Sequence, residues 1–159
     1  MALTIFDEHV PGPVEHAGGD RLVLPFERRQ IARQRVKLAS GREAAVLLPR
    51  GTILRGGDLL RCRSGETITV VAAPEDVSTV HCTDRSLLAR LAYHLGNRHV
   101  MLEVGDGWVR YARDHVLDDM VRHLGCDVVH ENVPFEPEGG AYAHTPARSG
   151  DGRHTHHAR

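Results

Sequence analysis

The hydrophobic pattern of this chain changes near residue 74, and that change constrains the fold more than any other feature. Before it, short runs of alternating polar and apolar residues are separated by turn residues at a spacing of about ten. After it, two stretches with helical spacing lie between strand-like runs. A chain of 159 residues can hold two small domains. We therefore expect a β domain over residues 1–74 and a mixed α+β domain over residues 75–138.

The first half predicts a small antiparallel β-barrel or sandwich. Residues 33–38 alternate polar and apolar side chains, Ser40-Gly41-Arg42 predicts a turn, and residues 43–48 return as the second strand of a hairpin. Further strands are expected at 21–26, 59–62 and 67–71. The segment Ala73-Pro74-Glu75-Asp76 predicts the domain boundary.

The second half predicts the order β-α-β-β-α-β, which is the ferredoxin-like arrangement. Asp84 or Thr83 can cap a first helix that ends at Gly96, and Asp114 can cap a second that ends at Gly125. The expected strands are 77–81, 99–104, 108–111 and 126–133, with a tight turn at 105–107. Residues 139–159 have almost nothing to bury, which predicts a disordered tail containing histidine.

Composition excludes several classes of function. The 20 Lys and Arg side chains nearly balance 21 Asp and Glu, so the chain has no basic field for a nucleic acid. No apolar run approaches the roughly 20 residues that span a bilayer, and the start lacks the pattern of a signal peptide. Three widely spaced cysteines predict a reduced, cytoplasmic setting. We expect the clustered Arg28, Arg29, Arg33 and Arg35 to lie on a solvated face or to meet an acidic partner.

Twelve histidines make metal binding the chemistry to test first. In the expected strand 99–104, Val100, Leu102 and Val104 alternate onto one face, which we expect to pack against the helices. His99 and Met101 then point the other way, toward solvent or a partner. One imidazole is a poor site, because Zn²⁺ or Ni²⁺ needs at least three or four donors. A two-fold dimer axis at this strand would bring two copies of His99 together. The alternative is an ordinary surface histidine.

The tail supplies further imidazoles. His154, His156 and His157 lie near the end of the chain, and His144 is a nearer donor. They can complete a coordination sphere that a pair of His99 side chains begins. The alternative is a solvated tail without a metal role.

Several motifs, in order along the chain, resemble the urease accessory nickel chaperone family UreE. They are L-P-F-E-R-R-Q at 24–30, L-L-P-R-G at 47–51, A-Y-H-L-G-N-R-H at 92–99, R-Y-x-x-D-H-V-L at 110–117 and P-F-E-P at 134–137. The resemblance covers nearly the whole chain.

That resemblance implies a nickel metallochaperone without catalytic residues. Its N-terminal domain would dock partners, and its C-terminal domain would dimerise and bind Ni²⁺ through one His99 from each subunit. The metal would pass to the urease apoprotein complex through the urease GTPase accessory protein. Zn²⁺ or Cu²⁺ would also bind in vitro. Some members carry a His-x-His motif where this chain has Arg113 and His115; since arginine stays protonated, His115 is a weak candidate.

Two other classes of function remain open. A metal-dependent hydrolase would need a general base near an open metal position, and Glu103 is the only obvious candidate. A plain protein adaptor would carry its histidines without a metal role.

Overall fold

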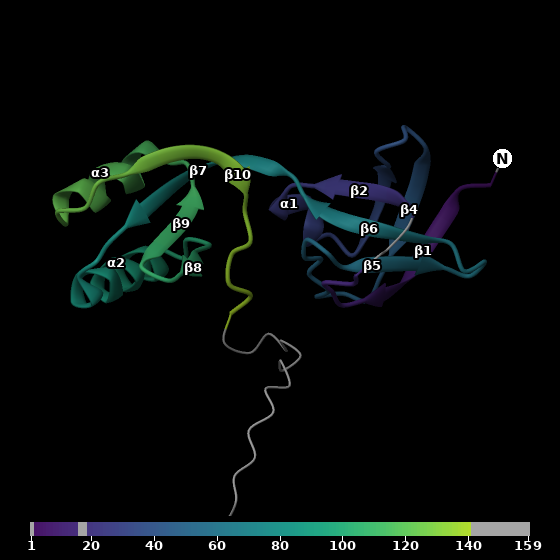
Figure 1. Ribbon diagram of the computed structural model, residues 1–159, viewed down its shortest axis with the longest axis horizontal. Helices are drawn as coiled ribbons and strands as arrows, with labels where there is room; N and C mark the ends of the chain where they lie inside the picture. The colour runs from purple at the N-terminus through teal and green to yellow at the C-terminus, as the bar shows by residue number, and fades with distance from the viewer. Residues whose placement is uncertain (1, 16–18, 141–159) are drawn as a thin grey trace, which may run out of the picture.

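Two β-sheets follow one another along the chain in the computed structural model, which describes residues 2–15 and 19–140 (Figure 1). The first sheet has six strands in the order β2-β6-β5-β1-β4-β3. Their bounds are β1 Thr4–Val10, β2 Asp20–Leu24, β3 Arg33–Lys37, β4 Glu43–Leu47, β5 Leu59–Cys62 and β6 Thr67–Ala72. A backbone hydrogen bond from Ala39 N to Arg21 O, 2.8 Å long, joins the two ends of the strand order. The sheet is therefore close to a barrel, as the sequence predicts.

Alternation along these strands builds the core of this domain. Phe6, Val46 and Ile68 point inward and are buried, while their strand neighbours face outward. The predicted hairpin of β3 and β4 and the predicted strands β5 and β6 are confirmed. Two features were not predicted: β1 is a central strand, and it pairs in parallel with β4, as β2 does with β6.

A short helix replaces the end of the expected strand 21–26. Strand β2 stops at Leu24, and α1 (Phe26–Arg29) follows directly with Pro25 as its N-cap residue. Proline has no N–H to continue a ladder, and its fixed φ suits the start of a helix. Phe26 consequently turns into a buried position.

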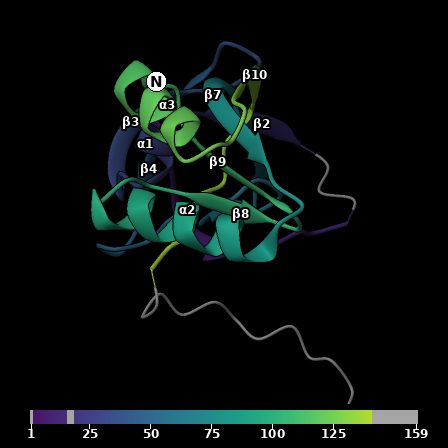
Figure 2. The same cartoon turned by 90° about the vertical axis from the view of Figure 1, so that its left-hand side faces the viewer.

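The second sheet has the strand order β10-β7-β9-β8, and the predicted β-α-β-β-α-β sequence of elements is confirmed. The elements are β7 Pro74–His81, α2 Arg85–Asn97, β8 Glu103–Gly105, β9 Trp108–Ala112, α3 His115–His123 and β10 Val129–Pro134. The side chains of Asp84 and Asp114 cap the two helices, as predicted. Both helices pack on one face of the sheet (Figure 2), around a core that includes Leu91, Val109 and Val121.

Three strands in this domain begin at residues other than those predicted. The strand expected at 77–81 already begins at Pro74, within the segment predicted as the domain boundary. The strand expected at 99–104 begins only at Glu103, because α2 continues through Gly96 to Asn97 and the turn that closes the helix includes His99 and Val100. The strand expected at 126–133 begins at Val129. Among the described helices none is long and apolar enough to cross a membrane.

The two sheets meet at a small seam rather than across a linker. Only Ala73 separates β6 from β7, and a separate apolar cluster contains Phe26, Val77 and Phe135. The expectation that Arg29 lies on a solvated face is wrong, because its exposed fraction is 0%. Its guanidinium donates to the carbonyl oxygens of Leu24 and Leu54, both at 3.2 Å. It also donates to the carbonyl oxygen of Phe135 and to the Glu136 carboxylate.

Candidate metal site

His99 terminates helix α2 instead of beginning a strand. Its backbone is left-handed, with a φ of 58°, and it is the one non-glycine residue with positive φ in the described part of the chain. His99 N bonds to Gly96 O at 3.0 Å, and Val100 N bonds to Leu95 O at 3.3 Å. These two bonds form a Schellman motif, in which Val100 packs against the same core as Leu95. The imidazole is thereby held on the surface, at the end of α2.

The two candidate ligands within the described residues, His99 and His115, lie at opposite kinds of helix end. His99 follows the C-terminus of α2, where unpaired carbonyl groups carry partial negative charge that favours a cation. His115 is the first residue of α3, where the N–H groups carry partial positive charge that disfavours one. Both side chains are exposed. The electrostatics of the fold thus favour His99 over His115 as a metal ligand.

An exposed apolar surface accompanies His99. Met101 is 42% exposed and Val104 is 51% exposed. The expectation that Val104 faces the helices with Val100 and Leu102 is therefore wrong for Val104, whereas the other two pack against the core. Strand β8 is also the edge of its sheet, next to β9 alone. An edge strand with exposed apolar neighbours is a surface that a second chain can cover.

The chain returns to β8 after its last strand. Glu136 N donates to Glu103 Oε2 at 3.0 Å, and Glu138 N donates to Leu102 O at 2.8 Å. Glu138 is therefore held at Leu102, which follows closely after His99 in the chain. The predicted tail ligands His144, His154, His156 and His157 lie outside the described residues. The position of Glu138 nonetheless shows that the chain leading to them starts beside the His99 segment.

Glu103, the base considered for a hydrolase, is occupied by structural contacts. Its carboxylate lies 3.5 Å from Arg110 Nη1 and accepts the Glu136 N–H. Within residues 2–15 and 19–140 no group of three or more His, Cys, Asp or Glu side chains could hold a metal ion. The described part of one chain therefore offers individual ligands and no complete coordination sphere.

Two histidines that the sequence did not single out bind buried carboxylates. His9 Nε2 lies 2.7 Å from Asp58 Oδ2, and His130 Nε2 lies 2.7 Å from Asp118 Oδ2. Tyr111 Oη donates to Asp118 Oδ1 at 2.7 Å. Burial alone would raise the pKa of Asp118, but the hydrogen bonds from Tyr111 and His130 outweigh it and lower this pKa. Burial of the Tyr111 hydroxyl raises the pKa of that group, and the hydrogen bond to the negatively charged Asp118 raises it further.

A sequence signal for Asp118 was present. It lies four residues after the capping Asp114 and three before the buried Val121, so it belongs to the helical stripe that faces the core. A carboxyl group in such a stripe needs buried partners. No comparable signal marked His9 or His130, because their partners lie on other elements, Asp58 ahead of β5 and Asp118 on α3.

Comparison with known proteins connects both halves of the chain to one family. The family model described as "UreE urease accessory protein, N-terminal domain" matches residues 6–73, and the one for the C-terminal domain matches residues 75–159. A protein named urease accessory protein UreE from Enterobacter sp. (strain 638) is 56% identical over 122 residues, covering 76% of this chain and 80% of that protein.

Two further relatives carry the same name. The protein from Pseudomonas putida (strain W619) is 55% identical over 126 residues, which is 79% of this chain and 78% of the relative. The protein from Teredinibacter turnerae is 49% identical over 140 residues, which is 88% of this chain and 90% of the relative. The similarity therefore extends through both sheets.

Proposed function

Because the chain belongs to the UreE family of urease accessory proteins, we propose that it is a nickel metallochaperone that acts as a homodimer and has no catalytic activity. Ni²⁺ is its cargo, and the urease active site is the destination. Residues 75–138 form the metal-binding and dimerisation domain in this proposal. Residues 1–74 dock partners, which include the urease apoprotein complex and the urease GTPase accessory protein.

The placement of His99 is the observation that carries this proposal. The imidazole is exposed where α2 ends, and the exposed Met101 and the edge strand β8 follow it in the chain. A second copy meeting the first at this surface would place two imidazoles together without any intrachain motif. An incomplete site in each chain is also compatible with release, since separating or rearranging the chains removes donors from the metal.

Tail histidines extend the same proposal. His144 comes six residues after Glu138, whose N–H is fixed to Leu102 O. Six extended residues span about 20 Å, which is enough to return to the end of α2. We assign His144, His154, His156 and His157 as added donors that raise affinity or capacity, and His115 as a weak candidate only.

The three cysteines are free thiols, which supports a cytoplasmic setting for this exchange. Neither rival function gains support. A hydrolase would need Glu103 as a base, yet that carboxylate already contacts Arg110 and the Glu136 N–H.

Calorimetric titration with Ni²⁺ at neutral pH tests the assignment. The ligand-removing variant is His99→Asn, since asparagine tolerates the left-handed backbone at this position. The matched control is His94→Asn, which removes an exposed imidazole from the same helix. We expect one tight Ni²⁺ per two chains for wild type and control, and its loss in His99→Asn with the dimer retained in light scattering. Deletion of residues 144–159 should weaken binding or reduce its capacity without abolishing it.

Retention of the tight site in His99→Asn would contradict the assignment of His99. Absence of any Ni²⁺ uptake by the wild-type protein in equilibrium dialysis would favour the adaptor instead.

A further inference from the structure

Positive charge is unevenly distributed between the two halves of the chain. Residues 1–74 contain 11 Lys and Arg against 8 Asp and Glu, whereas residues 75–138 contain 6 against 12. Ion pairs occupy several cations of the first half, namely Arg29, Arg42, Arg55, Arg61 and Arg63. Of those without an ion pair in the described structure, four gather on α1 and β3: Arg28, Arg33, Arg35 and Lys37.

Strand register places these cations beside an apolar strip. Ile5 on β1 pairs with Ala45 on β4, and Ala45 pairs with Arg35 on β3. In the next outward row, Leu47 pairs with Arg33. Since the alternate residues of these strands are buried in the core, this face presents aliphatic side chains on β1 and β4 and a column of cations on β3.

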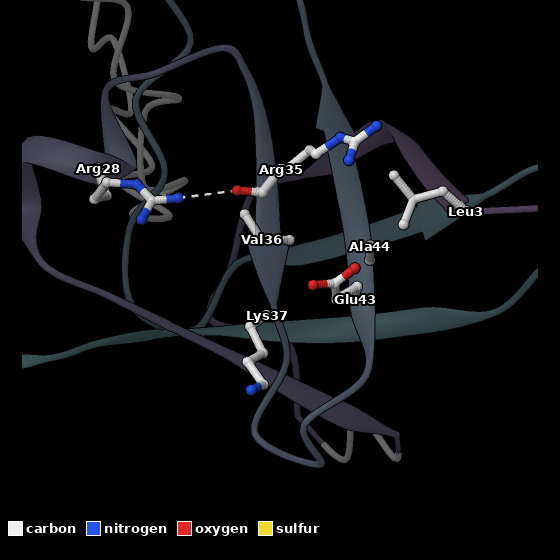
Figure 3. A pocket seen from close by; sticks show the side chains of 7 residues that line it. All are labelled: Leu3, Arg28, Arg35, Val36, Lys37, Glu43 and Ala44. Atoms are coloured by element: carbon white, nitrogen blue, oxygen red, sulfur yellow. Dashed lines mark hydrogen bonds between the residues drawn. The ribbon is translucent and has the colours of Figure 1, made fainter.

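The exposed fractions support a surface that is open to a partner. Ile5 is 46% exposed and Leu47 is 45% exposed. A hollow on this face is lined by Leu3, Arg28, Arg35, Lys37 and Glu43 among others, and Arg35 reaches from β3 across β4 toward Leu3 (Figure 3). A second hollow shares Leu3 and includes Ile5 and Leu47. The two hollows therefore adjoin at Leu3.

Arg28 determines how a partner can approach. Its Nε donates to Gln34 Oε1 at 2.7 Å and its Nη2 donates to Arg35 O at 3.0 Å, as the dashed line in Figure 3 shows. The guanidinium thus covers an outward backbone acceptor of the edge strand β3. Addition of a further strand at this point is blocked, so a partner must bind through its side chains on the face of the sheet.

We propose that this basic–apolar face, formed by Leu3, Ile5, Ala45 and Leu47 with Arg28, Arg33, Arg35 and Lys37, docks a protein segment that carries carboxylates beside an apolar stripe. The proposal rests on the docking role assigned above to residues 1–74 and specifies the surface and the chemistry of the partner. Charge complementarity identifies the occupant, because guanidinium groups that lack an ion pair and lie next to aliphatic side chains favour carboxylates with apolar neighbours.

Glu43 determines which cations of this face should contribute most to docking. Glu43 lies opposite Lys37 in the β3–β4 register and is the acidic residue of the hollow. It repels a partner carboxylate at that end of the face. Arg33 and Arg35 should therefore contribute more to docking than Lys37.

A labelled peptide built from leucine and glutamate tests the proposal with the full-length protein. Fluorescence anisotropy is measured for wild type, for Arg33→Glu/Arg35→Glu, and for Arg85→Glu/Arg90→Glu. The last variant makes the same change of charge on exposed residues of α2. We expect at least a tenfold weaker affinity in the first variant, little change in the second, and weak binding of a peptide with glutamine in place of glutamate. Ile5→Ser/Leu47→Ser should also weaken binding.

Several outcomes would overturn the proposal. They are failure of wild type to bind the peptide, equal losses in both charge variants, and equal binding of polyglutamate, which lacks the apolar stripe. Tighter binding to phosphatidylserine vesicles than to the peptide would point to a membrane, and a change of mass in Arg33→Glu/Arg35→Glu would point to a second copy of the chain. Calorimetry with Ni²⁺ on the same variants separates this proposal from the metal assignment, since nickel uptake should be unaffected.

Discussion

His99 has a left-handed backbone that ends helix α2, and the same residue carries the imidazole that we propose as a metal ligand. A residue with a Cβ in this conformation costs about 1 kcal/mol relative to glycine. The Schellman bonds from His99 N and Val100 N hold it there. Residues with a strained backbone conformation occur most often at active sites and ligand-binding positions. Replacement by alanine would mix loss of the ligand with backbone strain, which is why asparagine is the better variant.

Asp118 stabilises the second domain through a carboxylate that is 2% exposed. Its lowered pKa means that the folded state favours the charged form, so this stabilisation is present above about pH 4 and is lost as the pH falls below it. We expect Asp118→Asn to lower the free energy of unfolding by about 1–3 kcal/mol at pH 7. Urea denaturation measures the free energy of unfolding of variant and wild type. The difference between the two proteins should be smaller near pH 3 than at pH 7.

The adjacent Asp119 provides the control for that experiment. Its side chain is 67% exposed and pairs with Arg122 at 3.2 Å, so Asp119→Asn should have little effect at either pH. Equal effects of the two substitutions would show that the buried network of Asp118, Tyr111 and His130 contributes no net stability.

The hairpin of β8 and β9 is the element that positions the proposed dimer surface. It turns through Asp106-Gly107, and Gly105 pairs with Trp108. A Cβ on Gly105 would lie 2.0 Å from Cε2 of Trp108, whose ring also lies under the Arg110 guanidinium at 4.5 Å. The indole therefore occupies the space that any larger residue at position 105 would need.

Gly105→Ala should accordingly lower the free energy of unfolding by about 1–3 kcal/mol, because the indole must move. Thermal unfolding and tryptophan fluorescence measure the effect, since Trp108 is the single tryptophan of the chain. Gly96→Ala is the control: a Cβ at Gly96 would meet no described atom within 4 Å beyond its own helix, and alanine favours the helix by up to about 1 kcal/mol. A loss of stability in Gly96→Ala that matched that of Gly105→Ala would refute the steric argument.

At the scale of the whole molecule, Arg29 connects the two sheets. One buried guanidinium bonds to carbonyl groups in the first domain and to Phe135 and Glu136 after the last strand of the second. Phe26 and Phe135 pack edge to face beside it, with ring centroids 6.0 Å apart. The same segment then leads past Glu103 to Leu102. The first domain, for which we propose a docking role, and the segment before residue 139 are thus held together by the contacts of Arg29 and Phe135.

Arg29→Ala should reduce the free energy of unfolding by about 3–5 kcal/mol, since it leaves several buried polar groups without a donor. Arg29→Lys should recover only part of this loss, because an ammonium group cannot reach all the acceptors that the planar guanidinium reaches. Chemical denaturation measures both. Arg42→Ala removes an exposed pair with Glu66, with side chains 42% and 37% exposed, and should cost about 0–1 kcal/mol. Similar losses in Arg29→Ala and Arg42→Ala would disprove the role of Arg29 at the seam.

The class of fold, the order of elements after residue 74 and the family could all be predicted from the amino-acid sequence. These follow from local properties: alternation in β4, the caps at Asp84 and Asp114, and the turn at Asp106-Gly107. Each depends on neighbours along the chain, so it can be read without the tertiary structure. The exposure of Met101 also follows from the alternation expected over residues 99–104, although the strand itself begins at Glu103 and not at His99.

Other features depend on contacts between different elements and appear only in the folded chain. The burial of Arg29 requires Glu136, more than a hundred residues later, and the burial of Asp118 on α3 requires Tyr111 on β9 and His130 on β10. The central place of β1 depends on partners at β4 and β5. The end of α2 was decided by packing of Val100 against the helix core, which allowed the helix to pass Gly96 and placed the backbone reversal at His99. Desolvation and contacts between elements determine these features, so the local propensity of each segment does not predict them.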